Sequence, residues 1–165
     1  MIKQLIIGDT LHELAATRRI LERLPEEHLS WKPHEKSMTL SGLATHLINL
    51  LNWQIAILQH SEFDLLTVPL RREPINKQAS ILNEFDENVD KLEKLLAECN
   101  EKLLAEEWTL RQGEHIIRSQ PRAMAFRTFG LSHMIHHRAQ LGVYLRLLNI
   151  PVPGSYGPSA DEEAP

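Results

Sequence analysis

The segment from Leu131 to Leu141 holds three of the nine histidines within five residues, inside a run from residue 121 to 149 with helical apolar spacing. In a helix of about 3.6 residues per turn, His133 and His137 lie about 40° apart on one face. Two imidazoles one turn apart can bind the same metal ion, which needs at least one more ligand from elsewhere. If this pair binds a metal, the fold must bring a ligand from a second element to this helix.

Periodicity elsewhere in the chain predicts the architecture. Apolar residues recur at helical spacing in three more stretches, residues 4–23, 37–60 and 76–99. The repeating row of the first stretch is Leu5, Gly8, Leu11, Leu14, Ala15, Arg18 and Leu21. Residues 61–75 are expected to form a loop, and residues 100–120 either a small hairpin or a loop. Four helices with no convincing sheet predict an all-α four-helix bundle, whose long connection lies between helices three and four.

Capping residues and prolines predict where the helices begin. Ser37 or Thr39 can cap the second helix, and Pro121 suits the first turn of the last one. The second helix carries His46 near its middle. The residues within about 60° of His46 on this helix are Thr39, Gly42, Leu43, Leu50, Trp53 and Ile57. Because this set is apolar or small, His46 is predicted to lie on the core face.

Three histidines are therefore candidate metal ligands: His46, His133 and His137. Burying imidazoles without partners would cost about 1–3 kcal/mol per unsatisfied group, and a metal ion would satisfy one nitrogen on each ring. His136 can pair with His133 instead, since it lies about 60° from it in the other direction. We prefer His137 because its side of the helix carries aromatic residues.

Other types of catalytic site are absent from the sequence. It contains no His-Glu-x-x-His, no Glu-x-x-His of di-iron bundles, no Gly-x-Ser-x-Gly, no Cys-x-x-Cys, no Walker loop and no dinucleotide fingerprint. Three neutral imidazoles on a divalent ion leave a coordination position open, which is typical of catalytic sites. Such a centre lowers the pKa of bound water or of a bound thiol.

Composition limits the surroundings in which the chain works. There are 18 basic and 22 acidic residues, and no basic run exceeds two residues, which argues against a nucleic-acid surface. The single cysteine, Cys99, excludes an internal disulfide and fits a reducing compartment. No signal-peptide pattern occurs, and no stretch approaches the ~20 apolar residues of a membrane span. We expect one soluble cytoplasmic domain over residues 1–165, with an irregular tail from about residue 150.

The sequence resembles the DinB superfamily of metal-dependent four-helix bundles over nearly its whole length. The motifs that carry the resemblance are Trp31-Lys32-Pro33-His34, Leu43-Ala44-Thr45-His46-Leu47 running to Trp53, His133-Met134-Ile135-His136-His137-Arg138-Ala139-Gln140-Leu141, Tyr144-Leu145-Arg146 and the tail from Pro153 to Asp161. Ala139 stands where this family is expected to have glycine. The resemblance implies one divalent ion, held by a histidine of the second helix and two of the last, which map onto His46, His133 and His137.

The resemblance also implies an activity. Related proteins act as bacillithiol S-transferases or as mycothiol-dependent maleylpyruvate isomerases, so we expect a metal-dependent transferase that activates a small thiol for attack on an electrophilic substrate. Gln140, Tyr144 and Tyr156 are candidate residues of the substrate pocket. Imidazole suits zinc, nickel, copper and iron, of which zinc or nickel is expected here. The alternatives are a non-enzymatic metal-binding stress-response protein and a metal-dependent hydrolase, which would need a general base.

The side of the last helix opposite the histidines suggests an assembly. Leu131, Ile135, Ala139 and Gly142 form a row there, where an isolated surface helix would carry charge. We predict that this row is covered, either by another part of the chain or by a second subunit in a homodimer.

Overall fold

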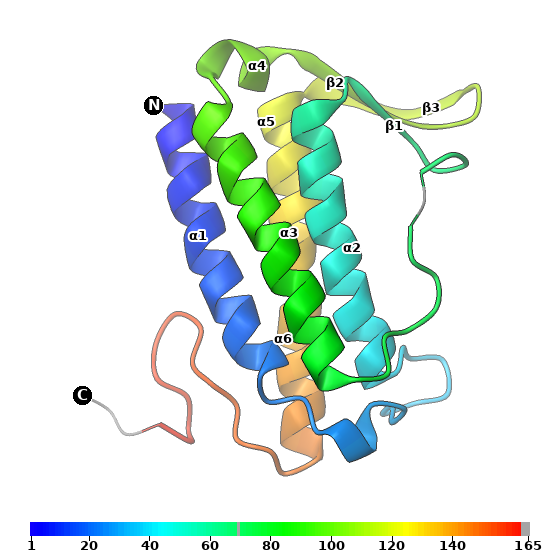
Figure 1. Cartoon of the computed structure of the whole chain (residues 1–165), viewed down its shortest axis with the longest axis vertical. Helices are drawn as coiled ribbons and strands as arrows, with labels where there is room; N and C mark the ends of the chain where they lie inside the picture. Colours follow the sequence, from blue (N-terminus) through cyan, green and yellow to red (C-terminus); the bar gives the residue numbers. More distant parts are fainter. Residues whose placement is uncertain (69, 163–165) are drawn as a thin grey trace.

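Four long helical stretches lie side by side in the computed structural model of the chain, which describes residues 1–68 and 70–162 (Figure 1). They are α1 (Ile2–Leu21), α2 (Leu40–Gln59), α3 (Gln78–Glu98), and a last stretch built from α5 (Arg122–Ala125), the π-helical segment η2 (Phe126–Ser132) and α6 (His133–Leu147). This confirms the predicted four-helix bundle. Pro69 of the expected loop and residues 163–165 of the expected tail lie outside the described residues.

A small three-stranded sheet closes one end of the bundle, where the sequence predicted no convincing sheet (Figure 1). After the short helix α4 (Glu101–Ala105), β2 (Glu107–Gln112) and β3 (His115–Pro121) form an antiparallel hairpin, which decides between the two alternatives for residues 100–120. Gly113 takes a positive φ of 60° at the turn, a conformation that glycine adopts readily. The expected loop after α2 begins with β1 (Glu62–Asp64), which pairs in parallel with β2.

An aromatic cluster joins this sheet to the bundle. Phe63 of β1 and Trp108 of β2 are fully buried, and their ring centroids are 6.4 Å apart. Trp53 of α2 packs 4.5 Å from Phe63, and Phe129 of η2 packs 6.0 Å from Trp108. The sheet thus covers the apolar end of α2 and of the last helical stretch.

The buried face of α1 differs from the predicted row. Leu5 is 65% exposed and Leu11 42% exposed, whereas Thr10, Glu13 and Thr17 are buried. The two threonine hydroxyls donate to the carbonyls four residues earlier, so their burial leaves no unsatisfied donor. Leu14 and Leu21 of the predicted row are buried, so the row and the buried face overlap in part. Periodicity counts Thr10, Glu13 and Thr17 as polar, and for that reason they are missing from the row.

The last helical stretch is buried on two sides. This stretch contacts α2, and it also contacts α1. The side chains of Leu131 and Leu141 are fully buried within the chain. Of the row predicted to be covered, Leu131 is thus covered by the chain itself, and a β-carbon at Gly142 would touch Val152 of the tail. Ala139 is exposed, so cover by a second subunit stays a prediction there. Pro121 ends β3 and precedes the helix, one residue earlier than expected.

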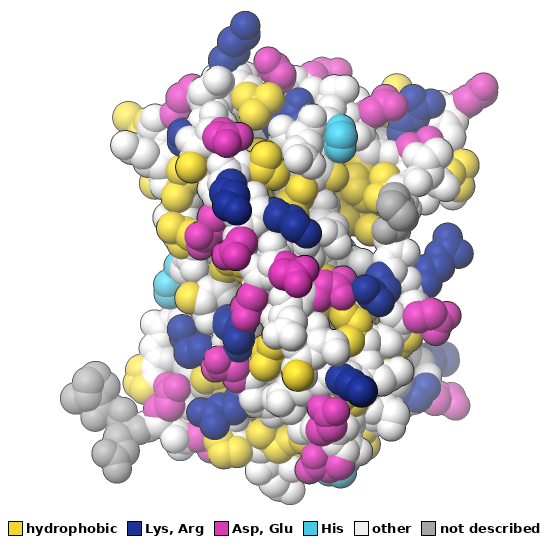
Figure 2. Space-filling model, viewed as in Figure 1, with side chains coloured by type: hydrophobic (Ala, Val, Ile, Leu, Met, Phe, Trp, Pro, Cys, Tyr) yellow, Lys and Arg dark blue, Asp and Glu magenta, His cyan; other side chains and the backbone are white. Residues whose placement is uncertain are grey.

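Residues 151–162 run irregularly along the bundle and are held by hydrogen bonds. The Asp161 carboxylate accepts from Arg146 of α6 and from the backbone N–H of Val152. None of the described helices is long and apolar enough to cross a membrane. Figure 2 shows acidic and basic side chains interspersed over one face of the molecule.

Candidate metal centre

Local capping fixes the start of α2 and with it the place of His46. Thr39, one of the two predicted caps, accepts a hydrogen bond from the backbone N–H of Gly42 at 3.0 Å. His46 then falls two turns into the helix, between fully buried neighbours, and its own side chain is half-buried. The predicted core-facing position of His46 agrees with this placement.

The helix that carries His133 and His137 approaches α2 closely just before the histidines. A β-carbon at Gly130 would lie 2.5 Å from Cγ of Gln54, so only glycine fits between the two helices at this level. Gly130 belongs to the π-helical segment that ends at Ser132, immediately before His133. Segments of this kind recur at functional sites.

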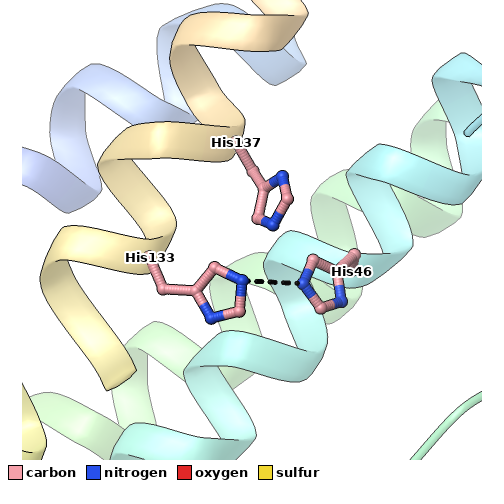
Figure 3. Close-up of side chains that lie close together, drawn as sticks. All are labelled: His46, His133 and His137. Atoms are coloured by element: carbon pink, nitrogen blue, oxygen red, sulfur yellow. Dashed lines mark hydrogen bonds between the residues drawn. The ribbon is translucent and has the colours of Figure 1, made fainter. Parts of the chain in front are cut away.

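The three predicted histidines converge (Figure 3). His133 and His137 extend from α6 towards His46 on α2, and one ring nitrogen of each lies within 4.8 Å of the others. The Nε2 atoms of His46 and His133 are 3.4 Å apart. Among the described residues, no fourth histidine, cysteine or acid joins this group. We refer to His46, His133 and His137 as the histidine cluster.

Burial keeps the histidine cluster uncharged. Desolvation, followed by repulsion from the two neighbouring imidazoles, lowers the pKa of His46 to about 4. Burial is also the main reason why the pKa values of His133 and His137 lie below the ordinary value for histidine. The neutral imidazole is the form that binds metal ions, so protons compete little for these nitrogens at neutral pH.

Gln140 lies beside the histidine cluster, and its contact with a substrate stays a prediction. Its Oε1 atom is 2.7 Å from Nδ1 of His137, so it can accept the Nδ1–H hydrogen bond and leave the Nε2 lone pair of that ring available. His136, the alternative partner considered for His133, is exposed and lies outside the cluster, although its ring packs 4.8 Å from that of His137. The structure therefore groups His137, not His136, with the other two histidines.

The two predicted pocket tyrosines, Tyr144 and Tyr156, contact residues outside the histidine cluster. Tyr144 is buried, with its ring edge-on to Trp31 at 5.7 Å. Tyr156, in the tail, donates to Glu13 at 2.8 Å and accepts from Arg138 at 2.9 Å. Their contact with a substrate stays a prediction.

Glu13 and Arg138 form a buried ion pair that was not predicted from the sequence. Arg138 is 3% exposed and Glu13 7% exposed, and the pair joins α6 to α1 directly behind His137. The only sequence signal was an arginine next to the histidine pair inside an apolar helix. Its partner lies more than a hundred residues earlier, so spacing could not reveal it.

A cavity of about 290 Å³ opens beside His46. Thr39, Gly42, Thr45 and Asn49 of the α2 region line one wall, and Arg71, Arg72 and Pro74 line another. His46 belongs both to the histidine cluster and to this cavity.

The histidine cluster fits a divalent metal ion. In a tetrahedral site with metal–nitrogen bonds of about 2.1 Å, two ligand nitrogens lie about 3.4 Å apart. This equals the separation of Nε2 in His46 and His133. The neutral rings and the hydrogen-bond acceptor behind His137 are the further features that such a site requires.

Comparison with known proteins agrees with the fold. The model of the DinB family matches residues 10–164. A DinB-like protein from Bacillus cereus ATCC 10987 has 20% identity and a TM-score of 0.71, over 92% of this chain and 95% of that one. The mycothiol-dependent maleylpyruvate isomerase has 12% identity and a TM-score of 0.60, over 93% of this chain and 62% of that one. The uncharacterized protein YrdA of Bacillus subtilis (strain 168) is 24% identical over 155 residues, which are 92% of this chain and 86% of YrdA.

Proposed function

This chain belongs to the DinB family, and we propose that it is a metal-dependent transferase that activates a low-molecular-weight thiol for attack on an electrophilic substrate. His46, His133 and His137 would hold the ion, and zinc or nickel suits three imidazoles. A divalent ion held there would lower the pKa of a bound thiol, so that the thiolate would exist at neutral pH.

The observation that carries the proposal is the composition of the histidine cluster. Three neutral imidazoles, with no fourth protein ligand among the described residues, leave a position for an exogenous group. A structural site would be closed by a fourth side chain. His46 also borders a cavity of about 290 Å³, which has room for a small molecule beside the histidine cluster.

The chain's own residues would orient the metal ligands. Gln140 holds the ring of His137 through Nδ1, and the buried Glu13–Arg138 pair fixes α6 against α1. In the reaction the thiol proton leaves to solvent, and the sulfur gives its electron pair to an electrophilic carbon to form a carbon–sulfur bond. A leaving group, or the adjacent unsaturated bond, takes up the displaced electron pair.

A structural neighbour supports a thiol as the reactant. The maleylpyruvate isomerase that shares the fold is mycothiol-dependent by name. A metal-dependent hydrolase, by contrast, needs a general base, and no acidic residue joins the histidine cluster in the described part of the chain. Glu13, the buried carboxylate of α1, is already bound to Arg138 and Tyr156.

The proposal is tested by metal content and thiol conjugation. Protein purified without a histidine tag should contain about one divalent ion per chain by mass spectrometry. It should also accelerate conjugation of a panel of small thiols with 1-chloro-2,4-dinitrobenzene. A chelated, metal-free sample that conjugates thiols at the native rate would overturn the proposal.

Two adjacent histidines provide a matched pair of variants. His137→Ala should lose most of the bound metal and the activity, because two remaining imidazoles hold an ion weakly. His136→Ala should keep both, since this ring is exposed and outside the cluster. Metal bound by protein without thiol conjugation would favour the non-enzymatic alternative.

A further inference from the structure

The cavity beside His46 carries positive charge only. Its charged lining residues are Arg71 and Arg72, and no aspartate or glutamate lines it. His46 lines the same cavity and so connects it to the histidine cluster. A small molecule that reaches the histidine cluster from this cavity therefore passes two guanidinium-bearing residues.

Side chains next to His46 hold these arginines in place. Asn49, one turn after His46, donates to the backbone carbonyl of Arg71 at 2.8 Å and accepts from the Arg71 N–H at 3.2 Å. Thr45, directly before His46, accepts from the backbone N–H of Ile75 at 2.9 Å. The loop of residues 71–75 is thus fixed to the same two turns of α2 that present His46.

The two arginines differ in what they already bind. The Arg71 guanidinium donates to Glu84 at 2.9 Å, which neutralises much of its charge. Within the described residues, no acidic group lies within 4 Å of the Arg72 guanidinium, and Arg72 is exposed. Arg72 is therefore the residue with an uncompensated charge at this cavity.

The backbone N–H groups at the start of α2 are not available to bind an anion in the cavity. The start of the helix lies at the cavity, but its first three N–H groups are bound within the chain. Leu40 donates to Trp31, Ser41 donates to Leu29, and Gly42 donates to the Thr39 hydroxyl. An anion in the cavity would consequently be bound by arginine, whose planar fork matches a carboxylate.

We propose that this cavity binds a carboxylate group of the small molecule that reacts at the histidine cluster, with Arg72 as the main contact and Arg71 beside it. The inference rests on the proposed function and deepens it, because it assigns the substrate class: a small thiol or electrophile that carries carboxylate. A charge-assisted hydrogen bond to a carboxylate contributes enough for a preference of about tenfold or more over a neutral analogue.

Three probes and two variants test the inference on the nickel-loaded full chain. The probes are 2-mercaptosuccinate, a thiol with two carboxylates; 1-thioglycerol, a neutral thiol; and succinate, which has the carboxylates without the thiol. Arg72→Gln removes the charge at the cavity. Arg118→Gln removes the same charge from β3, a strand that is not part of the cavity, and is the matched control. Dissociation constants are measured by titration calorimetry at two salt concentrations.

The expected result is that mercaptosuccinate binds at least tenfold tighter than thioglycerol, and that this preference weakens with salt. Arg72→Gln should reduce the preference to about threefold or less without changing thioglycerol binding, while Arg118→Gln leaves both unchanged. Equal binding of the two thiols by the wild-type chain would overturn the inference and leave the proposed function standing. Succinate that binds through Arg72 as tightly as mercaptosuccinate, without any binding of thioglycerol, would leave the carboxylate site standing and overturn the binding of a thiol at the metal. No binding of any probe would overturn both.

Discussion

Replacing Gln140 by Leu is expected to weaken metal binding at the histidine cluster by about 10- to 100-fold while the fold persists. The Gln140 side chain accepts the Nδ1–H bond of His137 at 2.7 Å. This bond selects the tautomer whose Nε2 lone pair is available and fixes the direction of the ring. Leucine has a similar volume but no acceptor, so both effects are lost together.

The magnitude follows from the hydrogen bond and from the orientation that it provides. A neutral hydrogen bond contributes about 1 kcal/mol net, which corresponds to roughly fivefold in affinity. Loss of the ring's orientation adds to this, and replacement of such outer partners of metal-binding histidines typically costs 10- to 100-fold. Because Gln140 is only half-buried, the free energy of unfolding of the metal-free protein should change by less than about 1 kcal/mol.

The assay is competition for zinc against a chromogenic chelator, combined with urea unfolding of the metal-free protein. Gln140→Glu keeps an acceptor at the same place and should retain wild-type affinity or exceed it, because a carboxylate makes the imidazole a stronger ligand. Equal zinc affinity of wild type and Gln140→Leu would refute the reasoning. So would a Gln140→Glu variant that is as weak as Gln140→Leu.

Three further outcomes are expected. Glu13→Ala should lower the free energy of unfolding in urea by about 3–5 kcal/mol, because it leaves the Arg138 charge buried without its partner; a loss under 1 kcal/mol would contradict the buried pair. Gly130→Ala should destabilise by about 1–3 kcal/mol through its 2.5 Å contact with α2, whereas Gly142→Ala, whose nearest contact is 3.6 Å, should be neutral or stabilising in the same unfolding series. Arg146, which binds Asp161, lowers the pKa of this carboxyl from 3.8 to about 2. The ionised Asp161 should therefore hold the tail fully above pH 3.8 and release it as the pH falls towards 2. Limited pepsin cleavage of the tail should increase over this interval, and unchanged cleavage would contradict the expectation.

Local chemistry was sufficient for the helices and for the histidine cluster. The i, i+4 spacing of His133 and His137 places both rings on one helix face whatever the rest of the chain does. His46 could be added because its neighbours on α2 are apolar or small, which predicts a core-facing position. The cap at Thr39 is likewise a local hydrogen bond, so the start of this helix was predictable.

Long-range polar contacts were beyond the sequence. Glu13 lies in the core of α1 because Arg138 of α6 neutralises it, and a pattern of apolar residues counts both as surface positions. The strand β1 is only three residues long and forms because β2, from a distant part of the chain, offers it a free edge. In both cases the partner that satisfies the polar group is remote, and only the folded chain brings it near.

The surroundings of the histidine cluster were also decided by the tertiary structure. The hydrogen bond between His137 and Gln140 is an exception, since it joins residues three apart on one helix, and the contact of Gln140 with a substrate stays a prediction. Arg71 and Arg72 reach the cavity because Asn49 binds the loop backbone in both directions. Residue identities and their spacing along a helix fix which side chains share a face. Which residues lie across a cavity from those side chains depends on how one segment packs on another. This packing uses backbone groups, which every residue carries, so the sequence does not reveal it.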